Sequence, residues 1–266
     1  LFLLGVPLGI LSILLYFPFY MGFSSQAGGI LPNFMYPTRG VHLWVMWGTL
    51  LIPIFAYLIY LSFGDSGVGQ LAVRLRSGVK PNWKLGFSLG LGFTFFLLLL
   101  TFMIGWVGSI LEKDFILGLL ASQNMTAGQF IAATSLRRLS YIGGLITLLA
   151  VFIPTLAFLF PLDHRSETLA EPGQRDTSTE TSTDHQSLLT SHSFIFLLLA
   201  LGAILVLVPD FVYLRDQFGY RINTVFKFYY QAWMLWSLAA AFGTAYLLQN
   251  LRGMKSVAFR VLIGLV

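Results

Sequence analysis

Polar side chains recur at four-residue intervals at the start of an otherwise apolar stretch, residues 221–248. The stretch begins RINTVFKFYYQAW and continues MLWSLAAAFGTAYLL. On a helix of about 100° per residue, Asn223, Lys227, Tyr230 and Gln231 share one face. Hydrogen-bonding side chains on one face of a membrane helix usually face the bundle interior or a watery cavity. The spacing therefore predicts a polar cavity along this face.

A charged segment precedes this stretch and adds groups that can do chemistry. Arg215, Arg221 and Lys227 only donate hydrogen bonds, and an arginine can hold a phosphate through two parallel bonds. Asp216 and Asp210 are the candidate catalytic residues, as a general base or as a ligand of a divalent metal such as Mg²⁺ or Mn²⁺. No metal-ligand motif accompanies them. A basic pocket with aromatic walls at a membrane surface suits the phosphate of a lipid-linked sugar.

A simpler interpretation explains part of the same pattern. Lys227 lies in the first turns and can extend its amine to the membrane surface, and the surrounding aromatic residues can form an interfacial belt. That interpretation does not explain why Asn223 and Gln231 lie on the same face. It also does not explain the nearby Asp216 and Arg221. Gln231 alone can instead link two helices, which is worth about 1 kcal/mol. Both interpretations stay open at this point.

The composition places the elements that position these residues in a membrane. The 266 residues are 56% hydrophobic and 10% charged, with a mean hydropathy of +0.78, whereas a soluble domain carries about 25% charged residues. The chain has no cysteine, which excludes disulfides and thiolate metal sites. The net charge of +5 comes from basic residues scattered between apolar runs, which indicates topology rather than nucleic-acid binding. Because the chain lacks an initiator Met and closes on an apolar run, we expect a fragment of a longer protein.

The apolar runs predict an all-α fold, a polytopic transmembrane bundle of about six to seven spanning helices. A span needs about 20 predominantly apolar residues, and isolated strands cannot satisfy their backbone in lipid. The alternating ten-residue pattern of a membrane β-barrel is absent. The predicted spans are residues 1–19, 41–63, 85–107, 141–162, 194–209 and 225–248, with a seventh starting at 257.

The sequence divides into three parts. Residues 1–162 hold the first four predicted helices with an outer loop at 20–40, and residues 194–266 hold the others with a charged outer loop at 210–224. Residues 163–193 are rich in Ser, Thr, Glu and Asp and predict a disordered cytoplasmic linker. Glycines and prolines in the loop GFSSQAGGILPNFMYPTRG predict a structured segment, either a cap over an outer cavity or an ordinary connector.

Lysines and arginines in short loops set the orientation. The basic loop Gly64–Lys84 and the basic segment after the sixth helix are predicted to be cytoplasmic, so residues 108–140 fall on the outer side. Arg137 and Arg138 do not fit this assignment. An interfacial or re-entrant segment within Phe115–Thr134 would account for them.

Two blocks resemble a known family, the YYY membrane proteins, a group of large hydrophobic proteins of unknown function. They are FVYLRDQFGYRINTVFKFYYQAW (211–233) and YFPFYMGFSSQAGGILPNFMYPTR (16–39). The family looks like a distant relative of the C-type glycosyltransferases, which use lipid-linked sugars at an outward-facing site. The tyrosine-plus-glycine signature and the acidic first outer loop are absent here. The resemblance implies that this chain holds the lipid-phosphate side of such a site, with matches at Arg215, Asp216, Arg221, Asn223, Lys227 and Gln231.

The leading hypothesis from the sequence is a glycosyltransferase-like protein of the cell membrane that handles a polyprenyl-phosphate sugar at the outer face. Its partners would be membrane lipid and a lipid-linked sugar, not nucleic acid, and its oligomeric state stays open. A transporter or lipid flippase is the first alternative, although nearly charge-free helices at mid-depth count against ion coupling. A non-catalytic assembly component is the second. The predicted substrate-binding residues are Arg215, Arg221, Asn223, Lys227, Tyr230 and Gln231.

Overall fold

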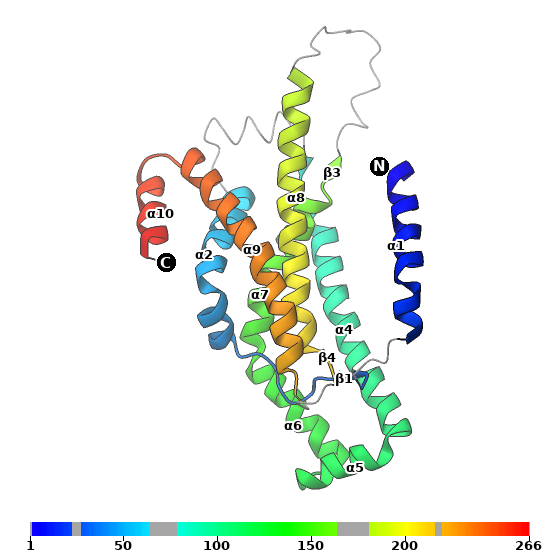
Figure 1. Ribbon diagram of the computed structural model, residues 1–266. Helices are drawn as coiled ribbons and strands as arrows, with labels where there is room; N and C mark the ends of the chain where they lie inside the picture. The colour runs from blue at the N-terminus through cyan, green and yellow to red at the C-terminus, as the bar shows by residue number, and fades with distance from the viewer. Residues whose placement is uncertain (1, 23–27, 64–78, 164–180, 216–219, 266) are drawn as a thin grey trace.

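The protein is built almost entirely of helices. The computed structural model describes residues 2–22, 28–63, 79–163, 181–215 and 220–265 (Figure 1). This architecture confirms the predicted all-α, membrane-type helical bundle. The helices are α1 (Phe2–Gly22), α2 (Gly40–Phe63), α4 (Trp83–Leu111), α5 (Lys113–Ser122), α6 (Ala127–Ser140), α7 (Ile142–Leu159), α8 (Thr181–Leu207), the 3-10 helix η1 (Val208–Asp210), α9 (Ile222–Asn250) and α10 (Met254–Leu265).

Four helices in the described part of the chain are long and apolar enough to cross a membrane: Gly40–Phe63, Trp83–Leu111, Ile142–Leu159 and His192–Asp210. They coincide with four of the predicted spans. The predicted spans at the start of the chain and at 225–248 are also helical, as α1 and α9. The apolar part of α1 is shorter, Val6–Phe19, and the amides, lysine and tyrosines of α9 lower its hydropathy. The count of six to seven spans stays a prediction.

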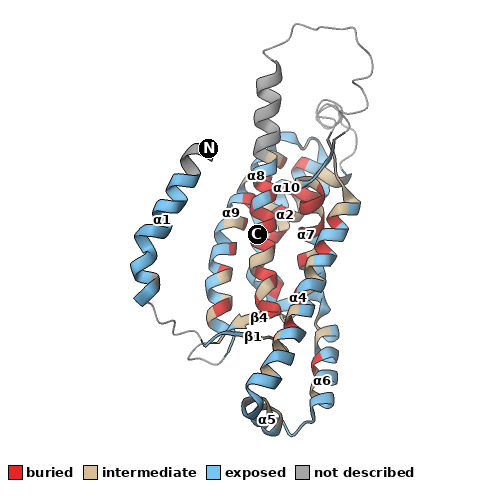
Figure 2. Cartoon of the chain, turned by 90° about the vertical axis from the view of Figure 1, so that its right-hand side faces the viewer, coloured by how far each residue is buried: buried red, intermediate tan, exposed pale blue. Residues whose placement is uncertain are grey.

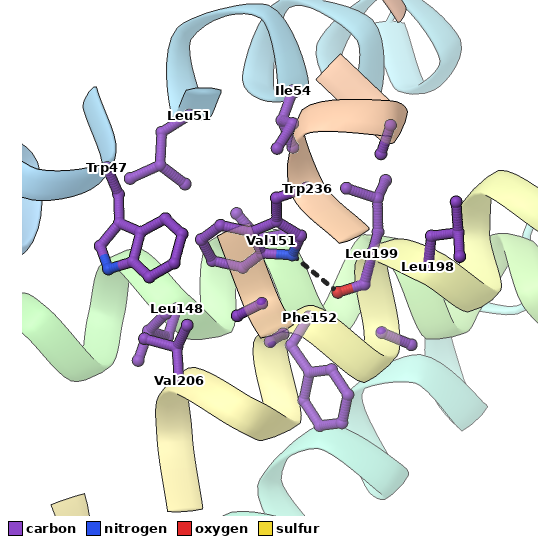
Figure 3. Close-up of a cluster of buried hydrophobic side chains, with 14 of the residues drawn as sticks. Trp47, Leu51, Ile54, Leu148, Val151, Phe152, Leu198, Leu199, Val206 and Trp236 are labelled. Carbon is purple, nitrogen blue, oxygen red and sulfur yellow. Dashed lines mark hydrogen bonds between the residues drawn. The ribbon is translucent and has the colours of Figure 1, made fainter. Parts of the chain in front are cut away.

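Helices α2, α4, α7, α8 and α9 pack around a core that contains Trp47 and Trp236. Both side chains are fully buried. Their rings meet edge to face with centroids 5.0 Å apart, a geometry that adds about 0.5–1.5 kcal/mol to area burial. The indole Nε1 of Trp236 donates to the carbonyl oxygen of Leu199 at 3.2 Å (Figure 3). These contacts hold α2 and α8 against α9.

Gly202 on α8 leaves the space that the Trp236 ring fills. A Cβ at this position would lie 2.2 Å from Nε1 of Trp236, so Gly202→Ala is expected to lower the free energy of unfolding by about 1–3 kcal/mol through overpacking. Unfolding of the purified variant in detergent measures this change in the free energy of unfolding. Gly92→Ala on α4 is the control, because a Cβ there meets nothing within 4 Å and alanine favours the helix by about 0.5–1 kcal/mol. Equal stabilities of the two variants would contradict this packing.

The loops predicted to lie on the outer face meet at one end of the bundle. Strand β1 (Ile30–Pro32) pairs antiparallel with β4 (Val212–Leu214), and α5 and α6 fold at the same end (Figure 1). Strands β2 (Val79–Lys80) and β3 (Leu162–Asp163) pair antiparallel at the opposite end. The structure therefore groups the loops as the charge pattern does. That the β1–β4 end is the outer one remains a prediction.

Helix α8 begins inside the segment predicted to be a disordered linker. It starts at Thr181, while residues 164–180 lie outside the described residues. The sequence TSTDHQSLLTSHSFIF contains no Gly or Pro, so the helix of the apolar run continues backward into its polar start. Side-chain packing of this helix is described from His192 onward, where Nδ1 lies 2.6 Å from the hydroxyl of Tyr57. Polar composition alone was therefore a poor guide to this boundary.

Candidate functional site

An ion pair between Asp210 and Arg221 lies at the β1–β4 end of the bundle. Asp210 ends the 3-10 helix that follows α8, and Arg221 is the residue that caps α9 at its start. The guanidinium Nη1 of Arg221 is 2.6 Å from Oδ1 of Asp210. Thr38 donates its hydroxyl to the same Oδ1 at 2.5 Å and accepts from Nη2 of Arg221 at 3.1 Å. Because both charged side chains are largely buried, this pair is a fixed element of the site.

Arg138, from α6, adds a second guanidinium to the pair. It donates to the backbone oxygen of Asn33 and, at 2.9 Å, to that of Asp210. Its guanidinium carbon lies 4.9 Å from the ring centroid of Phe211. Burial lowers the pKa of the Arg138 guanidinium, the negative charge of Asp210 raises it, and the nearby Arg221 lowers it again. Arg138 therefore links α6 to the Asp210 backbone from within a partly desolvated environment.

Asn33 ties the loop after β1 to the same region. Its side chain is 1% exposed. Its Nδ2 lies within 3.2 Å of the backbone oxygens of Tyr36, Pro209 and Asp210, and its Oδ1 accepts from the backbone N–H of Tyr36 at 3.1 Å. A buried amide with all its groups paired fixes a single loop conformation. The loop that the sequence predicted to be structured is therefore held down on η1.

A cavity of about 720 Å³ opens beside this cluster. Aromatic rings form part of its wall, among them Tyr36, Trp47, Tyr141 and Tyr229. Its basic lining residues are Arg39, His42, Arg137 and Arg221, and no Asp or Glu is among the described residues that line it. The loop 35–39 forms one side of the cavity, in line with the interpretation of this loop as a cap.

Two of the lining arginines are held without a carboxylate. The guanidinium carbon of Arg39 lies 4.7 Å from the ring centroid of Tyr141, and Nη1 of Arg137 donates to the backbone oxygen of Met35 at 3.1 Å. Within the described chain, neither is within ion-pair distance of an acidic side chain. The cavity therefore presents three guanidinium groups near one carboxylate, that of Asp210, and favours an anionic ligand.

The structure separates the sequence-predicted residues into three groups. Arg221 lines the cavity and Asp210 pairs with it. Arg215 lies elsewhere, in an exposed pair with Glu112 at 2.9 Å, and Asp216 lies outside the described residues. The other four occupy α9 on the side turned away from the cavity: Asn223 is half-buried, and Lys227, Tyr230 and Gln231 are exposed.

The prediction that this stripe faces the bundle interior is therefore wrong for the described helices. The face of α9 that lines the cavity carries Val225 and Tyr229, about 200° and 240° around the axis from Asn223 at 100° per residue. The large rings of Tyr229 and Trp236 occupy the interior instead. Whether the stripe binds substrate is not tested by its position and stays a prediction.

Sequence reasoning missed Asn33, Thr38 and Arg138. Arg138 had one signal, its conflict with the charge rule for orientation. The predicted interfacial segment before it is helical, as α5 and α6 at the end of the bundle. Asn33 and Thr38 lay in the Gly- and Pro-rich loop but carried no signal of their own. Among the described residues, no group of three or more His, Asp or Glu is placed to hold a metal ion; Asp216 lies outside these residues.

The fold and the site together define a multi-pass helical membrane protein with a basic pocket at one end of its bundle. It belongs to the family described as "Uncharacterized membrane protein (DUF2298)", whose family model matches residues 2–236. No curated protein and no solved structure matched the chain. The family description gives membrane location and no activity.

Proposed function

We propose that the basic pocket binds the phosphate of a lipid-linked sugar, as part of a glycosyltransferase-like protein of the cell membrane. One observation carries the proposal: Arg39, Arg137 and Arg221 line a single cavity at the end of a membrane bundle. Arginine binds phosphate through two parallel charge-assisted hydrogen bonds. The same positive charge would stabilise a phosphate that departs from the sugar in the transition state.

An apolar groove next to the pocket supports a lipid as the ligand. It has a volume of about 630 Å³ and lies between the starts of α2 and α7, lined by Val41, Trp44, Val45 and Thr147 with two glycines. Other residues on the same turns of α2, such as His42 and Met46, line the pocket. A phosphate in the pocket would therefore lie beside a groove suited to its hydrocarbon chain. This placement agrees with an amphipathic ligand better than with a water-soluble sugar phosphate.

Asp210 has a positioning role in this proposal. Its carboxylate orients Arg221 through the 2.6 Å ion pair and accepts from Thr38, so the Oδ1 that faces these donors is already engaged. Asp216 remains the other predicted catalytic carboxylate. The transfer itself would break the bond between the anomeric carbon and the phosphate oxygen and join that carbon to an acceptor hydroxyl, whose proton a base must take.

Arg39→Ala and Arg137→Ala are each expected to weaken binding of a polyprenyl phosphate by about 10-fold or more, because each removes one charge-assisted contact. The affinity for polyprenyl phosphate is measured with the purified full-length protein in nanodiscs. The matching polyprenol, which lacks the phosphate, is measured for comparison. Arg215→Ala is the matched control, since Arg215 pairs with Glu112 outside the cavity.

Two outcomes would contradict the proposal. Unchanged affinity in both pocket variants would show that the phosphate does not bind in this cavity. Equal binding of polyprenol would show that the protein does not recognise the phosphate. Loss of affinity in Arg215→Ala alone would return the site to the segment that the sequence first indicated. Transfer from a labelled polyprenyl-phospho-sugar then tests the enzymatic step, and movement of the lipid across proteoliposomes without transfer would support a flippase instead.

A further inference from the structure

One face of α9 is exposed along most of the helix and repeats with the spacing of a helix-packing seam. The positions follow one another at alternating steps of four and three residues, and every one of them is exposed. Figure 2 shows α9 at the edge of the bundle, pale blue along much of its length. Steps of four and three give the 3.5-residue repeat of helices that pack together in a left-handed pair. The seam consists of Lys227, Gln231, Met234, Leu238, Ala241, Ala245 and Leu248.

The polar start of this seam lies at membrane depth. Trp47, on the second turn of the candidate span Gly40–Phe63, contacts the rings of both Tyr229 and Trp236, with centroids 5.4 Å and 5.0 Å away. Gln231 lies between these two residues on α9 and therefore at the level of Trp47. At about 1.5 Å per residue, Lys227 is only about 6 Å nearer the helix start. At this depth the exposed amide of Gln231 faces lipid unless another element covers it, and the amine of Lys227 does so unless its side chain extends to the membrane surface.

Neither group has a polar partner within the described chain. No hydrogen bond or ion pair of Lys227 or Gln231 occurs among the residues that the structure describes. Ionisable and amide side chains in a membrane are costly in lipid and normally pair with a neighbouring helix. Further along the seam, Ala241 and Ala245 are four residues apart, and small residues at this spacing let two helices approach closely. The polar start and the small-residue end are both features of a helix interface.

We propose that this seam of α9 packs against another transmembrane helix, one that bears a carboxylate at the level of Lys227. A second copy of the chain does not fit. Two copies in one membrane have the same orientation, so a two-fold pair through α9 would place Lys227 against Lys227. Helix α1 does not fit either, because Phe2–Gly22 contains no Asp or Glu. This inference is independent of the lipid-phosphate proposal, which uses the opposite face of α9.

Synthetic transmembrane helices test the chemistry of the partner. Two leucine-rich peptides are compared, identical except for one Glu or Leu about two turns inside the membrane, and energy transfer to the labelled full-length chain in phosphatidylcholine vesicles reports binding. The Glu peptide is expected to bind at least about 10-fold tighter, and Lys227→Leu is expected to remove the difference. Lys113→Leu, an exposed lysine on α5, is the matched control and should retain it. Equal binding of the two peptides to the wild-type chain would overturn the proposal.

The absence of cysteine from the sequence permits a second test in native membranes. A fluorophore on Ala241→Cys is expected to be protected from a brominated-lipid quencher, compared with the same label on Leu99→Cys, an exposed position of α4. Equal quenching would show that lipid covers the seam and would overturn the proposal. A disulfide-linked homodimer of Ala241→Cys would also overturn it, in favour of a second copy.

Discussion

Asp210→Ala is expected to lower the free energy of unfolding by about 3–5 kcal/mol, the usual cost of removing one partner from a buried ion pair. Asp210 lies 2.6 Å from Arg221, and its negative charge also acts on the guanidinium of Arg138. Without it, Arg221 is left charged and largely buried, beside the charge of Arg138. Thr38 also loses the acceptor of its hydroxyl. Denaturant unfolding in detergent measures the change.

Two further variants separate the ion pair from a general effect of mutation. Asp210→Ala combined with Arg221→Met is expected to recover part of the loss, because the uncompensated charge is gone and an apolar pair often substitutes for a buried ion pair. Glu112→Ala breaks the exposed pair with Arg215, whose side chains are 36% and 48% exposed, and is expected to cost about 1 kcal/mol or less. If Asp210→Ala and Glu112→Ala have equal effects, the Asp210 pair is not the buried element that its geometry indicates.

The helices could be predicted from the sequence because lipid allows few alternatives. Runs such as 41–63 and 85–107 are too long and too apolar for loops, and a helix alone satisfies their backbone. The matching helices Gly40–Phe63 and Trp83–Leu111 start and end within a few residues of the predicted limits. The boundary at Thr181 was missed because its residues are polar and a helix can extend beyond the apolar run that starts it.

The face that α9 turns to the interior could not be predicted from its own sequence. Periodicity shows which side chains share a face, such as Lys227 and Gln231, but two amphipathic solutions remain. The rings of Tyr229 and Trp236 determine which face of α9 turns inward. Both rings pack against Trp47, and the Trp236 ring also fills the space that Gly202 leaves open. That information lies on α2 and α8 and becomes available only when the bundle forms.

The sequence drew attention to the part of the candidate site whose residues are neighbours in the chain, and gave little sign of the part whose residues are distant. Asp210 and Arg221 share one loop, and their charge drew attention to it. Asn33 contacts the Asp210 backbone across 177 positions, and Arg138 does so across 72. An arginine on the unexpected side of a membrane protein was the one visible sign of the second contact. A charge that conflicts with the charge rule for orientation thus marks a residue that the fold uses.

Arg137 and Arg138 are expected to have opposite phenotypes although they are adjacent. Arg138→Met removes the donor of two backbone oxygens, those of Asn33 and Asp210. The Asp210 oxygen keeps the side-chain amide of Asn33 as a donor at 3.2 Å, whereas the Asn33 oxygen loses its donor. One buried carbonyl left unpaired costs about 1–3 kcal/mol, so we expect a loss of about 1–3 kcal/mol in the free energy of unfolding. Arg137→Met removes an exposed side chain from the cavity wall, so its stability is expected to change by less than about 0.5 kcal/mol while phosphate binding falls.

The conservative variant distinguishes charge from geometry at Arg138. Arg138→Lys keeps a positive charge near Asp210 but lacks the planar guanidinium, whose Nη2 donates to both carbonyl oxygens. If Arg138→Lys is as unstable as Arg138→Met, the paired hydrogen bonds hold the loop after β1 against η1. Full stability in Arg138→Lys would show instead that the charge alone suffices. Loss of stability in Arg137→Met together with loss of phosphate binding in Arg138→Met would reverse the roles assigned to the two arginines. Arg137 would then hold the pocket wall in place, and Arg138 would bind the phosphate.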